Sequence, residues 1–252
     1  MNTTRLLVFL IITILTYRLS SCVTVYRPVV INSPVLQDKG EGNIAASIGL
    51  LGDGLYNLQG AYAVSDKLAL MLNGMHHAKS YGSMNADSDK IRFFSVESGV
   101  GYFRNLNPAK SILFQCYTGP GLGRTKSINT GNSSTVDFSA YYASFFVQPG
   151  IAYTEDNFDA ALDIKANYLW MYDIHGRLYS EFEFWNTESQ QVNNMMLHLI
   201  NLEPAITIRG GGKKIKGVFQ SGLVIPLYKS KNYLVMNQFI KTSVGIYYTF
   251  NY

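Results

Sequence analysis

The chain has 252 residues and a formal net charge of +4, which is too small to indicate a nucleic-acid-binding protein. Only 15% of its residues are charged, whereas about 25% is typical of soluble proteins. Aromatic residues reach 13% and include 18 tyrosines, and 22 residues are glycine. This composition is typical of a β protein that has one face in an apolar medium.

The N-terminus carries the features of a secretory signal. Arg5 precedes a short apolar run, Leu6 to Leu15, and this run leads to Leu19-Ser20-Ser21-Cys22. The last four residues resemble the lipobox of exported bacterial lipoproteins. The resemblance implies that residues 1–21 are a signal peptide and that Cys22 carries a covalent lipid. The alternative is a plain signal peptide that precedes a cysteine by coincidence.

Residues 22–42 are expected to form a lipidated, extended tether. Arg27-Pro28 and Ser33-Pro34 disfavour a helix, because a residue before proline is driven toward extended conformations. Residues 38–42 add a polar stretch that contains two glycines. If Cys22 is acylated, Cys116 has no partner and no disulfide is expected.

From residue 43 to residue 252 the sequence alternates between apolar and polar or small residues. A period of two is typical of strands whose two faces lie in different surroundings. Tyr56, Leu58 and Tyr62, for example, alternate with Asn57 and Gln59. The pattern predicts ten strands, at 43–51, 55–64, 67–77, 91–103, 111–123, 139–153, 158–172, 198–209, 215–226 and 238–252.

The connections between these strands alternate in length. Apart from a short first connection at 52–54, short ones at 65–66, 104–110, 154–157 and 210–214 alternate with long ones at 78–90, 124–138, 173–197 and 227–237. This arrangement resembles bacterial outer-membrane β-barrel proteins, with short periplasmic turns and longer outer loops. The resemblance implies an all-β, antiparallel, up-and-down transmembrane β-barrel of about ten strands over residues 43–252. Such a barrel is closed, because hydrocarbon does not tolerate unpaired strand edges.

The resemblance extends to biogenesis and location. The alternating aromatics Tyr248, Phe250 and Tyr252 resemble the terminal strand that the barrel-assembly machinery recognises. Ten strands place both ends of the barrel on the short-turn side. We therefore expect an outer-membrane protein with its N-terminus on the periplasmic side. Val23, which follows the cysteine, fits the outer-membrane pattern of lipoproteins.

Two prolines complicate this assignment. Pro149 and Pro204 fall inside predicted strands, where each removes a ladder hydrogen bond. A closed barrel would need bulges to accommodate them. A soluble, lipocalin-like barrel could place them on an edge strand, and a periplasmic carrier of an apolar ligand is therefore one alternative function.

Charged residues are predicted on the inward faces of the strands. An eight-stranded barrel is filled by its own side chains, and a ten-stranded barrel is little wider. The sequence therefore predicts a packed polar core in which carboxylates pair with cations, and an open channel is the alternative. The predicted lumen residues are Glu97, Asp163, Lys165, Glu203, Arg209 and Lys241.

The longest connection, 173–197, carries a candidate binding rim. Asp173 and His175 resemble the Asp and His residues of ten-stranded outer-membrane proteases, and a carboxylate can orient a histidine for proton transfer. The companion acidic pair of that family is not recognisable here. Phe184 and Trp185 are loop aromatics, which are typical of binding surfaces, or they cap the barrel.

The sequence thus favours an outer-membrane β-barrel lipoprotein with a structural or binding role and no catalytic activity. Its expected partners are outer-membrane lipid, the covalent lipid on Cys22 and the barrel-assembly machinery, and its ligand is unknown. A rim hydrolase is a further alternative. No cofactor and no metal site are expected, because His76 and His77 are adjacent and point to opposite faces of a strand.

Overall fold

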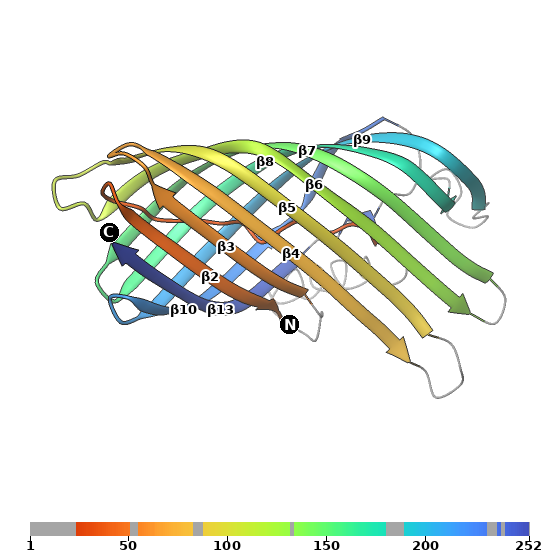
Figure 1. Cartoon of the computed structure of the whole chain (residues 1–252), viewed down its shortest axis with the longest axis horizontal. Helices are drawn as coiled ribbons and strands as arrows, with labels where there is room; N and C mark the ends of the chain where they lie inside the picture. Colours follow the sequence, from red (N-terminus) through yellow and green to blue (C-terminus); the bar gives the residue numbers. More distant parts are fainter. Residues whose placement is uncertain are drawn as a thin grey trace, which may run out of the picture.

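The computed structural model describes residues 24–50, 55–82, 88–131, 134–179, 189–230, 236–237 and 240–251. Nearly all of these residues form one closed, antiparallel β-barrel (Figure 1). Its strands are β2 (Glu41–Gly49), β3 (Leu55–Ala63), β4 (Leu68–Gly82), β5 (Ser88–Asn105), β6 (Ile112–Gly131), β7 (Ser134–Glu155), β8 (Phe158–Tyr179), β9 (Ser189–Gly211), β10 (Ile215–Leu223), β11 (Ile225–Lys229) and β13 (Ile240–Asn251).

Each strand of the barrel pairs with its neighbour in the chain. β10 and β11 together act as one strand, because both pair with β9 and they are separated only by Val224. β10 also pairs with β13, and β13 pairs with β2, which closes the ring. The prediction of an antiparallel barrel of ten strands is confirmed.

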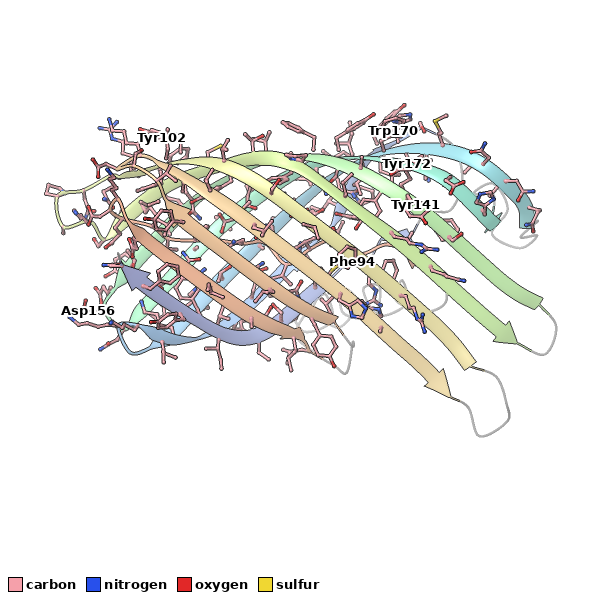
Figure 2. All side chains as sticks on the ribbon, viewed as in Figure 1. Phe94, Tyr102, Tyr141, Asp156, Trp170 and Tyr172 are labelled. Carbon is pink, nitrogen blue, oxygen red and sulfur yellow. The ribbon has the colours of Figure 1, made fainter. Side chains whose placement is uncertain are left out.

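The outer face of the barrel is apolar, whereas its inward positions hold most of the polar side chains together with three apolar clusters. On β3, Leu58 is 61% exposed on the outer face, whereas Asn57 and Gln59 are buried in the interior. The aromatic side chains of Tyr102 and Trp170 also lie on the outside of the barrel (Figure 2). The alternation predicted from the sequence is confirmed, with the apolar set on the outer surface.

Six strands extend beyond their predicted ends. The hairpins β4–β5, β6–β7 and β8–β9 each continue into their connection, so most residues of the predicted loops 78–90, 124–138 and 173–197 are strand. The prediction of long loops is wrong there. The outward residues of these extensions, such as Arg124 and Lys126, are polar, so the sequence lacks the apolar alternation that marks the other strands. The strands still pair there, because pairing depends on backbone hydrogen bonds and not on alternation.

The two prolines are accommodated without the expected bulges. The β7–β8 ladder skips Gln148 and Pro149 and resumes in the same register. The pairing of β9 with β10 and then β11 skips Glu203 and Pro204 and also keeps its register. Because proline has no N–H, the ladder omits a pair instead of inserting a residue.

The N-terminal segment passes through the interior of the barrel. β1 (Thr24–Tyr26) pairs in parallel with β12 (Met236–Asn237), at the end of the barrel that carries the long connections. The chain then crosses the interior to the short-turn end, where Gly40 donates its N–H to Ala63 and β2 begins (Figure 1). All residues from 26 to 36 are buried.

Two predictions about this segment are therefore wrong. Residues 26–36 are extended, as expected, but they fill the barrel and are not a tether outside it. Residue 24 lies at the long-connection end, whereas the sequence predicted an N-terminus at the short-turn end. The physical reason is the apolar content of the segment, since burying one Val, Ile or Leu side chain contributes roughly 1.5–3 kcal/mol.

The segment contributes to three apolar clusters in the barrel interior. Tyr26 belongs to the cluster nearest the long-connection end, Val29 and Val30 belong to a second cluster, and Val35 and Leu36 belong to the cluster nearest the short turns. Barrel residues in these clusters include Tyr142 and Leu169, Met75 and Phe93, and Phe103 and Phe146, respectively. The N-terminal segment is therefore part of the core.

Candidate functional site

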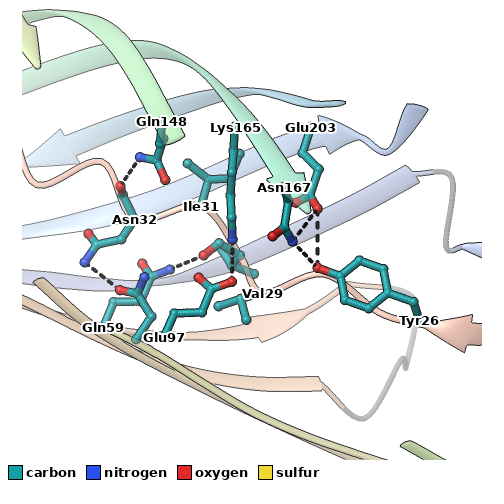
Figure 3. A network of polar contacts seen from close by, with 12 residues as sticks. Tyr26, Val29, Ile31, Asn32, Gln59, Glu97, Gln148, Lys165, Asn167 and Glu203 are labelled. Carbon is teal, nitrogen blue, oxygen red and sulfur yellow. Dashed lines mark hydrogen bonds and ion pairs between the residues drawn. The ribbon is translucent and has the colours of Figure 1, made fainter. Parts of the chain in front are cut away.

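Amide side chains of the barrel bind the backbone of the N-terminal segment (Figure 3). Gln59 Nε2 on β3 donates to the carbonyl of Val30 at 2.5 Å, and Gln148 Nε2 on β7 donates to that of Asn32 at 2.7 Å. An extended segment without a neighbouring strand would otherwise bury unpaired N–H and C=O groups. The lumen amides satisfy these groups from different walls of the barrel.

Gln220 on β10 makes the most complete contact of this kind. Its Oε1 accepts the N–H of Ile31 at 2.9 Å, and its Nε2 donates to the carbonyl of Ile31 at 2.7 Å. The same Nε2 lies 2.6 Å from Thr207 Oγ1. Because an amide has both a donor and an acceptor, one side chain replaces the two bonds that a neighbouring strand would make.

Two ion pairs lie in the middle of the lumen beside the segment, and Figure 3 shows the pair of Lys165 and Glu97. Lys165 Nζ is 2.5 Å from Glu97 Oε1, and Lys241 Nζ is 3.0 Å from Glu203 Oε2. All four side chains are at most 3% exposed. The hydroxyl of Tyr26 donates to Glu203 Oε1 at 3.4 Å, and Lys241 also donates to a segment carbonyl. The four charges cancel, as burial requires.

Arg209 and Asp163 are also buried in the lumen. Arg209 Nη2 donates to the carbonyl of Ser33, and its guanidinium carbon lies 3.9 Å from the ring centre of Tyr247. Asp163 Oδ1 accepts from Gln115 Nε2 at 3.0 Å. All six predicted lumen residues thus lie inside the barrel, where they contact one another, the segment or neighbouring amides. This arrangement holds the segment in place.

Asp173 and His175 lie on the outer wall and not in the mouth of the barrel. β8 carries one extra residue opposite β7 just before His175, and Asp173 has a φ of 53°. This bulge turns both side chains outward, and His175 Nε2 lies 2.7 Å from Asp173 Oδ1. Among the described residues, no third His, Cys, Asp or Glu completes a metal-binding group with them.

A polar cavity of about 240 Å³ opens at the short-turn end of the barrel. Its lining includes both acidic and basic residues, such as Lys213 and Asp156, whose Nζ and Oδ2 atoms lie 2.7 Å apart. Nearby, Lys110 Nζ lies 2.6 Å from Asp38 Oδ1. Because opposite charges are paired at this end, the cavity has no marked preference for an anion or a cation.

The sequence prediction missed the segment and several of the groups that bind it. Gln115 and Gln220 are not among the predicted inward polar residues, although both are buried and contact the segment. The available signal was the abundance of amides on the inward faces of the strands. Cys22, Phe184 and Trp185, and the signal peptide 1–21, lie outside the described residues.

Comparison with protein-family models and with curated proteins finds no match for this chain. In the described part of the chain, no helix is long and apolar enough to cross a membrane. A group of three or more His, Cys, Asp or Glu side chains able to hold a metal ion is likewise absent from the described residues.

Proposed function

We propose that the protein is an outer-membrane β-barrel lipoprotein with a structural or binding role, whose lumen is closed by its own N-terminal segment. The observation that carries the proposal is that the outer face of the barrel wall is apolar and most polar side chains point inward. The outer wall exposes large apolar side chains around the whole ring, including Leu58, Leu122 and Ile246, while the amides and the ion pairs lie in the interior. A membrane barrel requires an apolar outer band.

The alternative of a lipocalin-like carrier receives less support. A soluble carrier of an apolar ligand needs a polar outer surface and an empty apolar interior. In this barrel, residues 26–36 occupy the interior and are bonded to its walls. A rim hydrolase is also less favoured, because Asp173 and His175 lie on the outer wall and not in the mouth of the barrel.

The membrane proposal is tested with the mature chain carrying Cys22→Ser, which removes the lipid without altering the barrel. We expect this variant to aggregate without detergent and to fold in detergent micelles or bilayers. Folded barrel should then migrate differently from boiled protein on a gel. A variant that remains monomeric in detergent-free buffer would contradict the proposal and favour the carrier.

The course of the segment adds a topological proposal. If the short turns face the periplasm, residue 24 lies on the outer side of the membrane. Cys22 is two residues away and can extend at most about 7 Å farther, so its lipid would also lie on the outer side. This replaces the earlier expectation of a periplasmic N-terminus.

Labelling of intact cells tests this orientation. In a chain that keeps Cys22, whose acylated sulfur cannot react, and carries Cys116→Ser, Thr24→Cys should react with a membrane-impermeant maleimide. Lys110→Cys in a short turn should react only after the membrane is permeabilised. The opposite pattern would place the short turns outside. Labelling of neither variant in intact cells would place residue 24 away from the outer surface.

A further inference from the structure

We propose that the outer wall near the long-connection end binds a phosphorylated membrane lipid. The phosphate would contact a basic cluster formed by Arg92, Arg124 and Lys126, and the acyl chains would occupy an adjacent apolar groove. This inference rests on the proposed membrane location and gives the barrel a partner of defined chemistry.

The basic cluster brings like charges together on one face. Arg92 on β5 lies directly opposite Lys126 on β6 in the ladder, and both side chains are exposed. The Cβ atoms of such a pair lie about 4.5–5.5 Å apart, and like charges placed directly opposite each other are destabilising. No carboxylate among the described residues forms an ion pair with either side chain. A bound anion would remove this repulsion.

Arg124 extends the cluster toward the apolar part of the wall. Its guanidinium carbon lies 5.0 Å from the ring centre of Tyr141 on the neighbouring strand, which orients the side chain. In the β5–β6 ladder it lies directly opposite Phe94. A guanidinium held in this way can present two N–H groups to one phosphate.

The groove begins where the basic cluster ends. It has a volume of about 730 Å³ and crosses the outer faces of β13, β2, β3 and β4 as far as Phe94. Its lining includes the apolar side chains of Ile48, Leu58 and Ile246. Gly74 keeps the floor open, because the nearest atom to a Cβ at this position would be 3.9 Å away.

Phe94 therefore borders both features, with cations on one side and the groove on the other. A ligand that matches both must carry a negative headgroup and an apolar body, as a phosphorylated lipid does. The short-turn end differs, because two of its exposed cations, Lys110 and Lys213, already pair with Asp38 and Asp156. We therefore expect the lipid headgroup to bind at the membrane surface on the long-connection side.

The test uses the purified full chain inserted into phosphatidylcholine bilayer discs that contain a small fraction of phosphatidic acid. Native mass spectrometry counts the phosphatidic acid molecules that remain bound. We expect the variant R92Q/R124Q/K126Q to bind about tenfold more weakly, which corresponds to about 1.4 kcal/mol. A matched variant, K67Q/R104Q/K214Q, removes three exposed cations near the short turns and should bind as the natural chain does.

A second variant tests the groove without changing charge. Gly74→Leu fills the open floor and should reduce retention of phosphatidic acid several-fold, while inorganic phosphate alone should not displace the lipid at equal concentration. Displacement by inorganic phosphate would reveal a simple anion site and overturn the lipid proposal. Equal binding by the natural chain and the R92Q/R124Q/K126Q variant would also overturn it.

Failure of this inference is distinguishable from failure of the proposed function. A natural chain that does not insert into the discs contradicts the membrane location, and the lipid site with it. A chain that inserts, shows heat-modifiable migration and yet retains no phosphatidic acid contradicts the lipid site alone.

Discussion

Replacing Lys165 with methionine should destabilise the barrel by about 3–5 kcal/mol, because it leaves Glu97 buried without its counter-charge. The two side chains are 1% and 3% exposed, and their charged atoms lie 2.5 Å apart. They belong to β8 and β5, so the pair joins separate walls across the lumen. Lys241 and Glu203 neutralise each other and leave no spare cation for Glu97.

Denaturant-induced unfolding in detergent micelles, followed by tryptophan fluorescence, measures this loss. The control is Lys213→Met, which breaks an ion pair of similar length whose side chains are 74% and 69% exposed. An exposed pair contributes at most about 1 kcal/mol, so this variant should unfold near the natural midpoint. The double variant Glu97→Gln/Lys165→Met should recover most of the stability, because no buried charge is left unpaired. An equal loss of stability in the two single lysine variants would contradict this prediction, and so would a double variant that is less stable than Lys165→Met.

Three further predictions follow from the interior. Deleting residues 24–36 should open the lumen and produce ion conductance in planar bilayers, whereas the natural chain should not conduct. A deletion variant that folds but does not conduct would contradict the proposal that this segment closes the lumen. Gln220→Leu removes both hydrogen bonds to the backbone of Ile31 and should cost about 2 kcal/mol or more in denaturant unfolding; an unchanged midpoint would show that these bonds contribute nothing. Gly119→Ala places a Cβ only 2.0 Å from a carbonyl oxygen of β5 and should cost about 1–3 kcal/mol, while Gly210→Ala meets no atom within 4 Å and should leave the unfolding midpoint nearly unchanged.

The barrel could be predicted from the sequence because alternation reports the face of each residue directly. Leu58 between Asn57 and Gln59 is sufficient to place β3 as a wall with one apolar and one polar side. The same rule fails where a strand leaves the apolar band, as it does at Arg124, because both faces there are polar or exposed. The extended hairpins were therefore predicted as loops.

The contents of the lumen could not be predicted in this way. Alternation assigns Glu97 and Lys165 to the interior, but it does not give their height along the barrel, which decides whether they meet. It also does not detect a bulge, and one extra residue in β8 moved Asp173 and His175 from the expected mouth to the outer wall.

The N-terminal segment escaped prediction for a related reason. Val29, Val30 and Ile31 are consecutive apolar residues without alternation, and the nearby Pro28 and Pro34 exclude a regular strand. A sequence with prolines and no periodicity is ordinarily a linker. Here, amides on the surrounding walls supply the hydrogen bonds that a sheet would supply, so an irregular segment can be buried.

This arrangement bears on where a binding function would be located. The lumen amides recognise main-chain groups of the segment, and its apolar side chains complete three interior clusters. Exchanging the segment for a ligand would therefore require replacing both sets of contacts at once. We infer that the lumen is structural and that binding takes place on the outer wall or at the long-connection end. The basic cluster and its groove lie at that end, on the same side of the barrel as residue 24.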